Sequence, residues 1–307
     1  MANLVLLLTC CNFYKKMQIL RDPGSCMPLS FVSQWLNEIS DQERFKIITY
    51  NSLNLVPLQE NDFNLAAKKE YKEWIKNLTN EDSKKIHLLI QYDVDAYPER
   101  TKKLLQVNEK YGIPANIMIF HECHSREKLK KYNKLELIDY EIDYEYLKYL
   151  ETKGFVIGYH FNGYERALFN IDLTSKVFIE DVQELRKHFD IKYFSPHGGV
   201  KDMQGKTNPH CVIIPPKIMK SIFWVHNGKS VKFAKTYSDG GITAKLGEYK
   251  PLKERSLIDF MKNMEPGKRY RILLHPQYYT DNYIFSEYMA QSAEWYYNLC
   301  TKYPPKV

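Results

Sequence analysis

The sequence has no C-x-x-C pair, no internal repeat and no hydrophobic run long enough to cross a membrane. Six cysteines stand at positions 10, 11, 26, 123, 211 and 300, without the spacing of paired thiolate zinc ligands or of a dense disulfide framework. We therefore expect reduced thiols and a cytoplasmic protein. A membrane span needs about 18 apolar residues, and no run approaches that length.

The amino terminus, MANLVLLLTCC, superficially resembles a secretory signal. It has no basic segment before its short apolar stretch, and no A-x-A-like cleavage site follows. We therefore expect a buried strand here.

Charge of one sign does not dominate either. Lysine and arginine exceed aspartate and glutamate by 44 to 37, a formal net charge of +7, and the basic residues are scattered among acids. With no RNA-binding motif, basic arm or zinc finger, the composition argues against a nucleic-acid partner. The sequence says nothing about oligomeric state.

Apolar runs of β type alternate with segments of helical periodicity through most of the 307 residues. Strands are predicted at NLVLLLTC, FKIITYN, HLLIQYDV, ANIMIF, FVIGYH, KYFSP and YRILLH, with helices between them. This alternation predicts an α/β fold with parallel strands, either a barrel or a doubly wound sheet. We divide the chain into a βαβα extension, residues 1–85, and a main domain, residues 86–307.

Helix ends are predicted from glycines and caps. One helix is expected over residues 98–111, ended by Gly112, another over 144–153, ended by Gly154, and a third over 176–188. Residues 197–247 contain HGGV, IIPPK and DGGI, which favour turns and short strands. Helices near 256–264 and in EYMAQSAEWYYNLC complete the prediction.

Four of the predicted strands end in an acid or a histidine: HLLIQYDVD, GFVIGYH, YFSPHGG and RILLHP. The carboxyl ends of parallel strands open on one face of a sheet or barrel. The side chains of Asp93 with Asp95, His160, His197 and His275 are therefore expected to converge. This pattern is typical of a metal-assisted hydrolase.

The residue types suit that chemistry. Asp93 and Asp95 flank Val94, so on an extended strand end they point the same way, either as joint metal ligands or as a ligand and a general base. His197 precedes two glycines that allow a backbone to approach an oxyanion closely. His275 is a candidate general acid, because histidine titrates near neutral pH.

In this order, D-V-D, Y-H, H-G-G, Y-S-D-G-G and L-L-H-P resemble the motifs of the polysaccharide deacetylase family, also called NodB-like or carbohydrate esterase family 4. The similarity covers about residues 86–279 and is closest to a divergent bacterial branch found among surface-polysaccharide genes. The resemblance implies a distorted (β/α) barrel of about seven parallel strands, with its active site at the carboxyl ends of the strands. It also implies a divalent metal, commonly zinc, that promotes hydrolysis of acyl groups on sugars.

Matching motif by motif, the resemblance implies Asp93 as general base, Asp95 and His160 as metal ligands, and His275 as catalytic acid, with Asp93 and Asp95 able to exchange roles. It places the substrate beside Tyr164, Gly198, Gly199 and Asp239. The chain departs from the family at two places: Tyr164 stands where a second motif histidine is usual, and P-H-G-G lacks the usual arginine.

The missing histidine leaves the third metal ligand open, and a catalytic zinc usually has three protein ligands. The candidates are His197, which we favour, Glu165, His121 and His124. The sequence thus predicts a metal-dependent hydrolase that removes an acyl group, acetyl above all, from a sugar or a surface-polysaccharide precursor.

Two other functions are compatible with the sequence. Without a third ligand, the protein would be a non-catalytic, deacetylase-like glycan-binding protein. Alternatively, D-V-D would be the metal-binding D-x-D of a glycosyltransferase. Against this second alternative, no glycine-rich phosphate loop follows the first predicted strand, and the strand-end histidines would have no role.

Overall fold

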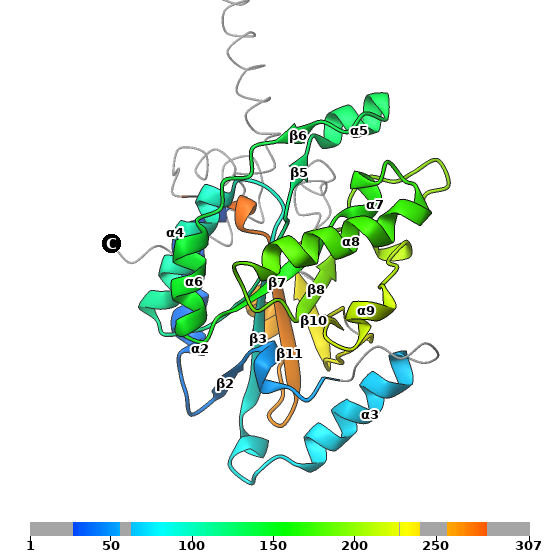
Figure 1. The fold of residues 1–307 in the computed structure, drawn as a ribbon. Helices are drawn as coiled ribbons and strands as arrows, with labels where there is room; N and C mark the ends of the chain where they lie inside the picture. The colour runs from blue at the N-terminus through cyan, green and yellow to red at the C-terminus, as the bar shows by residue number, and fades with distance from the viewer. Residues whose placement is uncertain (1–26, 56–62, 227, 240–256, 281–307) are drawn as a thin grey trace, which may run out of the picture.

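The computed structural model describes residues 27–55, 63–226, 228–239 and 257–280. The strand predicted at NLVLLLTC and the helix predicted at EYMAQSAEWYYNLC lie outside these residues. Within them, the predicted α/β fold is confirmed: helices surround a parallel sheet (Figure 1).

Eight strands of the described residues form the main sheet, in the order β10, β11, β3, β4, β7, β8, β9, with β2 pairing with β3 off this path. All neighbouring strands are parallel. The strands are β2 (Phe45–Ile48), β3 (Ile86–Val94), β4 (Asn116–Ile119), β7 (Val156–Phe161), β8 (Tyr193–Pro196), β9 (Phe223–Trp224), β10 (Lys235–Ser238) and β11 (Arg269–Leu274).

Two small sheets accompany the main one. In the first, β1 (Met27–Pro28) pairs with β12 (Tyr279–Thr280), and in the second, β5 (Cys123–His124) pairs with β6 (Leu137–Ile138). The helices are α2 (Leu29–Ile39), α3 (Phe63–Lys76), α4 (Pro98–Lys110), α5 (Arg126–Tyr132), α6 (Tyr144–Thr152), α7 (Gly163–Arg166), α8 (Ile171–Arg186), α9 (Pro216–Met219) and α11 (Leu257–Lys262).

The main sheet curls into a distorted half-barrel, as predicted. Arg271 on β11 donates a hydrogen bond of 2.7 Å to the backbone carbonyl of Val225, which directly follows β9. In the sheet order, β3, β4, β7 and β8 lie between these two strands. A flat sheet would hold strands this many places apart well beyond contact distance, since neighbouring strands are about 4.8 Å apart. The interior of the curl is thus narrow enough for one side chain to bridge.

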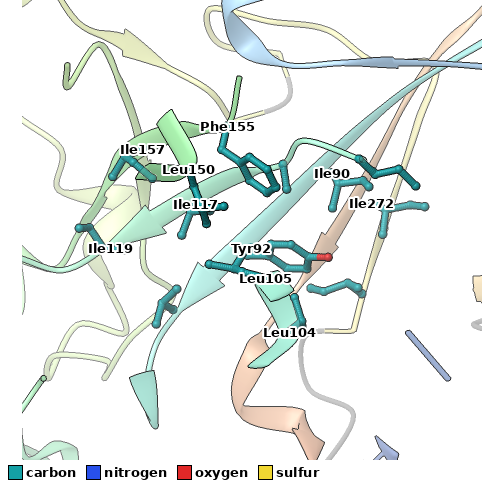
Figure 2. Packing of buried hydrophobic residues seen from close by; sticks show 14 of the residues in the cluster. Ile90, Tyr92, Leu104, Leu105, Ile117, Ile119, Leu150, Phe155, Ile157 and Ile272 are labelled. Carbon is teal, nitrogen blue, oxygen red and sulfur yellow. The ribbon is translucent and has the colours of Figure 1, made fainter. Parts of the chain in front are cut away.

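Side chains alternate between the two faces of β3, as the period of a strand requires. Leu88, Ile90, Tyr92 and Val94 belong to the core between the sheet and its outer helices. Figure 2 shows this layer, in which Tyr92 packs against Leu104 and Leu105. Leu89 lies in a second cluster inside the half-barrel. Asp93 and Asp95 have the parity of Leu89 and so belong to the inner face.

Asn116 lies at the edge of β3 along which both β2 and β4 pair. The first half of β3 pairs with β2 and the second half with β4, so the backbone pairing changes partner between them. The buried Asn116 amide donates to the carbonyl of Ile90 at 2.8 Å and accepts from the backbone N–H of Tyr50 at 2.9 Å. The segment before residue 86 is therefore joined to the sheet itself.

A buried ion pair fixes helix α3 at the amino end of β11, which is the end of the sheet away from Asp93 and Asp95. The guanidinium of Arg269, at the start of β11, donates to both carboxylate oxygens of Glu70, at 3.0 and 2.6 Å. Arg269 has no exposed surface and Glu70 is only 8% exposed. A bidentate pair of this kind adds geometric specificity to charge.

Helix α8 begins earlier than predicted, at Ile171. The side chain of Asn170 accepts hydrogen bonds from the backbone N–H groups of Asp172 and Leu173, which caps the helix there. The antiparallel pair of β5 and β6 and the short helix α7 were not predicted, because segments of two to four residues have no readable period. No described helix is long and apolar enough to span a membrane.

Candidate active site

The strand-end residues converge, as expected from parallel topology. Nε2 of His160 lies 2.9 Å from Oδ1 of Asp95, and Nε2 of His197 lies 3.7 Å from Oδ2 of the same carboxylate. Nε2 of His275 is 3.8 Å from Oδ2. Residues that follow or end β3, β7, β8 and β11 therefore surround one carboxylate, that of Asp95.

The two imidazoles nearest Asp95, those of His160 and His197, each contact a second group through Nδ1. Nδ1 of His160 is 2.9 Å from the backbone carbonyl of Ser195, and Nδ1 of His197 is 3.2 Å from Oε2 of Glu165. An acceptor at Nδ1 keeps a proton on that nitrogen, so Nε2 is the ring atom that would be available to a metal ion bound beside Asp95. Such rear partners are the usual supports of metal-binding histidines.

Glu165 is a fully buried carboxylate with several donors. Besides His197, it accepts from the backbone N–H of Val200 at 2.6 Å and from the side chain of Asn208 at 2.7 Å. Burial alone raises its pKa, but the nearby histidines His124 and His197 and the amide donors lower it more, so its pKa lies well below the ordinary value. Glu165 therefore stays ionised behind His197.

His275 forms a tight pair with Asp239. Nδ1 of His275 is 2.5 Å from Oδ1 of Asp239, whose Oδ2 accepts from the backbone N–H of His275 and from the hydroxyl of Tyr279. Burial lowers the pKa of His275, but the carboxylates of Asp239 and Asp95 raise it by more than burial lowers it. The resulting pKa is about 10. His275 is thus a protonated imidazole near neutral pH.

The histidines around Asp95 shift its pKa in the opposite direction. Burial raises its pKa, but the neighbouring rings of His197, His275 and His160 lower it more, to a value well below the ordinary range. The side chain of Asp95 is 13% exposed and that of His275 14%, whereas His160 is at 2%. The carboxylate and the acid are thus partly accessible to solvent, whereas His160 is buried.

Phe120 forms an apolar wall beside the histidines. Its ring stacks on His160 at a centroid distance of 5.0 Å and meets the edge of His197 at 5.3 Å. The predicted strand ANIMIF contains this residue, but nothing in the pattern marked it as part of a site. Packing on both rings restricts their rotation, which a coordinating pair requires.

The residues predicted to contact substrate divide into two groups. Gly198 is exposed, and a Cβ there would meet no atom within 4 Å, so space lies beside it. Gly199 has φ +66°, and a Cβ there would lie 2.5 Å from Oε2 of Glu165. Tyr164 is buried, with its hydroxyl on Asp202 at 2.6 Å, and Asp239 lies behind His275 with 2% exposure. The last three contact protein groups.

Aromatic rings near the site pack in the core. Tyr193, Tyr237, Tyr278 and Tyr279, from the motifs YFSPHGG, YSDGG and HPQYY, are each at most 9% exposed. These rings therefore serve packing and present no exposed face on which a sugar could stack.

Of the alternative ligands, Glu165 and His124 lie in the outer layer. Nε2 of His124 is 3.7 Å from Oε1 of Glu165, and His124 is 4% exposed. His121 lies on the loop before β5 and is half-buried. The structure thus brings His197, and not these residues, to the carboxylate of Asp95.

No group of three or more His, Cys, Asp or Glu side chains in the described part of the chain already has a geometry that would hold a metal ion. The donors Asp95, His160 and His197 nevertheless fit a divalent ion chemically. Two ligand atoms about 2 Å from a tetrahedral ion lie roughly 3.3 Å apart. His160 and His197 approach different oxygens of Asp95, Oδ1 at 2.9 Å and Oδ2 at 3.7 Å, and these two separations lie on either side of that value.

Gln277 is a site residue that the sequence did not reveal. Its Nε2 donates to Oδ2 of Asp95 at 3.2 Å, and its backbone carbonyl accepts from Arg100 at 2.9 Å. A glutamine in the motif HPQYY has no distinctive spacing. Its position two residues after His275 was the one available signal.

No protein-family model matches the sequence, and no curated protein sequence matches it either. Among solved structures, a peptidoglycan deacetylase from Bacillus subtilis is similar at 14% identity and a TM-score of 0.36, over 70% of this chain and 91% of that one. A family 4 carbohydrate esterase from Bacillus anthracis is similar at 13% identity and a TM-score of 0.31, over 72% and 84%.

A carbohydrate esterase from Streptococcus mutans is similar at 12% identity and a TM-score of 0.33, over 77% of this chain and 87% of that one. These likenesses are distant. The function proposed below therefore rests on the side chains of this chain and their geometry.

Proposed function

We propose that this protein is a metal-dependent hydrolase that removes an acyl group, acetyl above all, from a sugar or a surface-polysaccharide precursor. The supporting observation is that Asp95, His160 and His197 meet at one point with the His275–Asp239 pair beside them. The motif order that resembles polysaccharide deacetylases agrees with it.

Asp95, His160 and His197 would hold the metal, for which zinc is the first candidate given two imidazoles and one carboxylate. When bound, the ion supplies Lewis acidity toward an acyl carbonyl and toward water. The Nδ1 contacts of both histidines, to the Ser195 carbonyl and to Glu165, keep their Nε2 atoms available as ligands.

The remaining residues handle protons. Asp93, on the inner face of β3, accepts the proton of the attacking water as general base. His275 donates its Nε2 proton to the departing amine or alcohol, while Asp239 holds Nδ1 and keeps the ring oriented. The raised pKa of His275 supports its role as the acid, because the imidazole is then charged and has a proton to donate.

The test combines elemental analysis of the untagged protein with acetate release from N-acetylated and O-acetylated sugars. We expect about one zinc per chain and release of acetate. A stoichiometric metal without hydrolysis of any substrate would favour a different reaction. Absence of both metal and hydrolysis would favour the non-catalytic glycan-binding alternative.

A further inference from the structure

A chain of hydrogen bonds runs from the segment before residue 86 to Asp93, through the interior of the half-barrel. The hydroxyl of Tyr50 donates to Oε1 of Gln91 at 2.5 Å, and Nε2 of Gln91 donates to Oδ1 of Asp93 at 2.6 Å. Tyr50 and Gln91 have no exposed surface, and Asp93 is 5% exposed. Water therefore does not compete for these contacts.

The orientation of the Gln91 amide follows from its neighbours. Besides Tyr50, Arg271 donates from Nη1 to Oε1 of Gln91 at 3.3 Å. Two donors at one end of an amide identify that end as the oxygen. The opposite end, which faces Asp93, is then the NH2 group. Gln91 thus presents a donor to the carboxylate.

Tyr50 is itself held on two sides. Its backbone N–H donates to the side chain of Asn116, and its ring lies 5.3 Å from that of Tyr193. Burial raises the pKa of Tyr50 to about 12, so its hydroxyl remains a donor at neutral pH. The hydroxyl and Arg271 together prevent the Gln91 amide from turning over.

We propose that Tyr50 and Gln91 are positioning residues for Asp93, so that the segment before residue 86 completes the catalytic centre. The inference rests on the proposed function, in which Asp93 is the general base. Because Gln91 anchors Oδ1, rotation of the carboxylate is restricted, and Oδ2 is the oxygen left for proton transfer. Misplacement of a reacting group by about 1 Å costs on the order of 100-fold in rate.

The decisive variant is Gln91→Met, which keeps the length of the side chain and removes the donor to Asp93. For the zinc-loaded protein we expect kcat to fall on the order of 100-fold while KM stays within about twofold, because the base and not substrate binding is disturbed. Zinc affinity, measured by competition with a chromogenic chelator, should not change, since Gln91 contacts no proposed ligand.

Tyr50→Phe provides a second variant if Gln91→Met does not fold, and Tyr92→Phe is its matched control. Tyr92, on β3, is as fully buried as Tyr50, but its hydroxyl donates at 2.7 Å to Asn108, on the outer face. Both variants lose one buried hydroxyl and should lose similar thermal stability. Only Tyr50→Phe should lower kcat, by about 10-fold.

The outcomes separate the two proposals. If the wild-type protein binds zinc and releases no acyl group from any sugar tested, the proposed function fails and the positioning role fails with it. If the wild type is active and Gln91→Met retains its kcat, or if Tyr50→Phe and Tyr92→Phe have equal kcat values, the positioning role alone is overturned.

Discussion

Nε2 of His160 lies 2.9 Å from Oδ1 of Asp95, although 65 positions separate the two residues in the chain. They stand at the ends of β3 and β7, which are not neighbours: β4 lies between them in the sheet. The contact therefore depends on inward-facing parity at both strand ends and on the curl of the sheet. Both conditions direct a carboxylate and an imidazole at the same point.

Replacing His160 by alanine should abolish zinc retention and hydrolysis together, because two remaining ligands are too few for a catalytic zinc site. Asp95→Asn should act in the same direction, since it removes the charge at the centre of the cluster. Zinc content after gel filtration and acetate release are the measurements. His188→Ala, at an exposed histidine after α8, is the control and should keep both.

Prolonged dialysis against a strong chelator should remove activity, and added zinc should restore it, since the ion supplies the Lewis acidity of the proposed reaction. Circular dichroism should show that the metal-free protein remains folded, because the hydrophobic clusters on both faces of the sheet do not involve the site. Full activity in the metal-free protein would contradict the proposal.

Glu165→Gln should weaken zinc binding by about 10- to 100-fold, the usual effect of removing a partner behind a metal-binding histidine. The amide has the same size as the carboxylate. Its NH2 group, however, would face either His197 or the other donors that bond to Glu165. Chelator competition measures the loss. Glu122→Gln removes a carboxylate that pairs with Arg166 and does not contact His197, so an equal loss in that variant would argue against a specific role.

Asp239→Asn should move the alkaline limb of the kcat/KM profile to lower pH by about one unit or more, the size of shift that an opposite charge produces. The Asp239 carboxylate contributes to raising the pKa of His275 to about 10. Without that charge the pKa falls, and the acid loses its proton at a lower pH. Asp202→Asn, which removes a carboxylate that bonds Tyr164, should leave the limb in place.

Glu70→Gln should lower the free energy of unfolding by about 3–5 kcal/mol, because it leaves the buried guanidinium of Arg269 without its charged partner. Urea unfolding followed by tryptophan fluorescence measures the change. Glu265→Gln breaks an exposed pair with Lys268 and should leave stability unchanged, since exposed ion pairs contribute little. Equal effects of the two variants would show that the Glu70 pair is not important for stability.

Strands such as HLLIQYDV and YRILLH were predictable because they are mostly apolar runs that are buried over nearly their whole length, and parallel pairing followed from the helices between them. The convergence of Asp95, His160, His197 and His275 was predictable for the same reason: each follows or ends such a run. The start of helix α8 was predicted too late, because the apolar pattern of its first turn is weak. The Asn170 cap marks the observed start.

The order of elements and the chemistry at each strand end are thus local properties, which the sequence alone determined through hydrophobic periodicity and the shared direction of parallel strands. Only the tertiary structure decided which candidate third ligand meets Asp95, because this depends on the depth of each side chain in a curled sheet. The candidates were His197, Glu165, His121 and His124. The contact of Tyr50 with Gln91 has the same origin: a strand added before residue 86 places a side chain inside a half-barrel built by residues far along the chain.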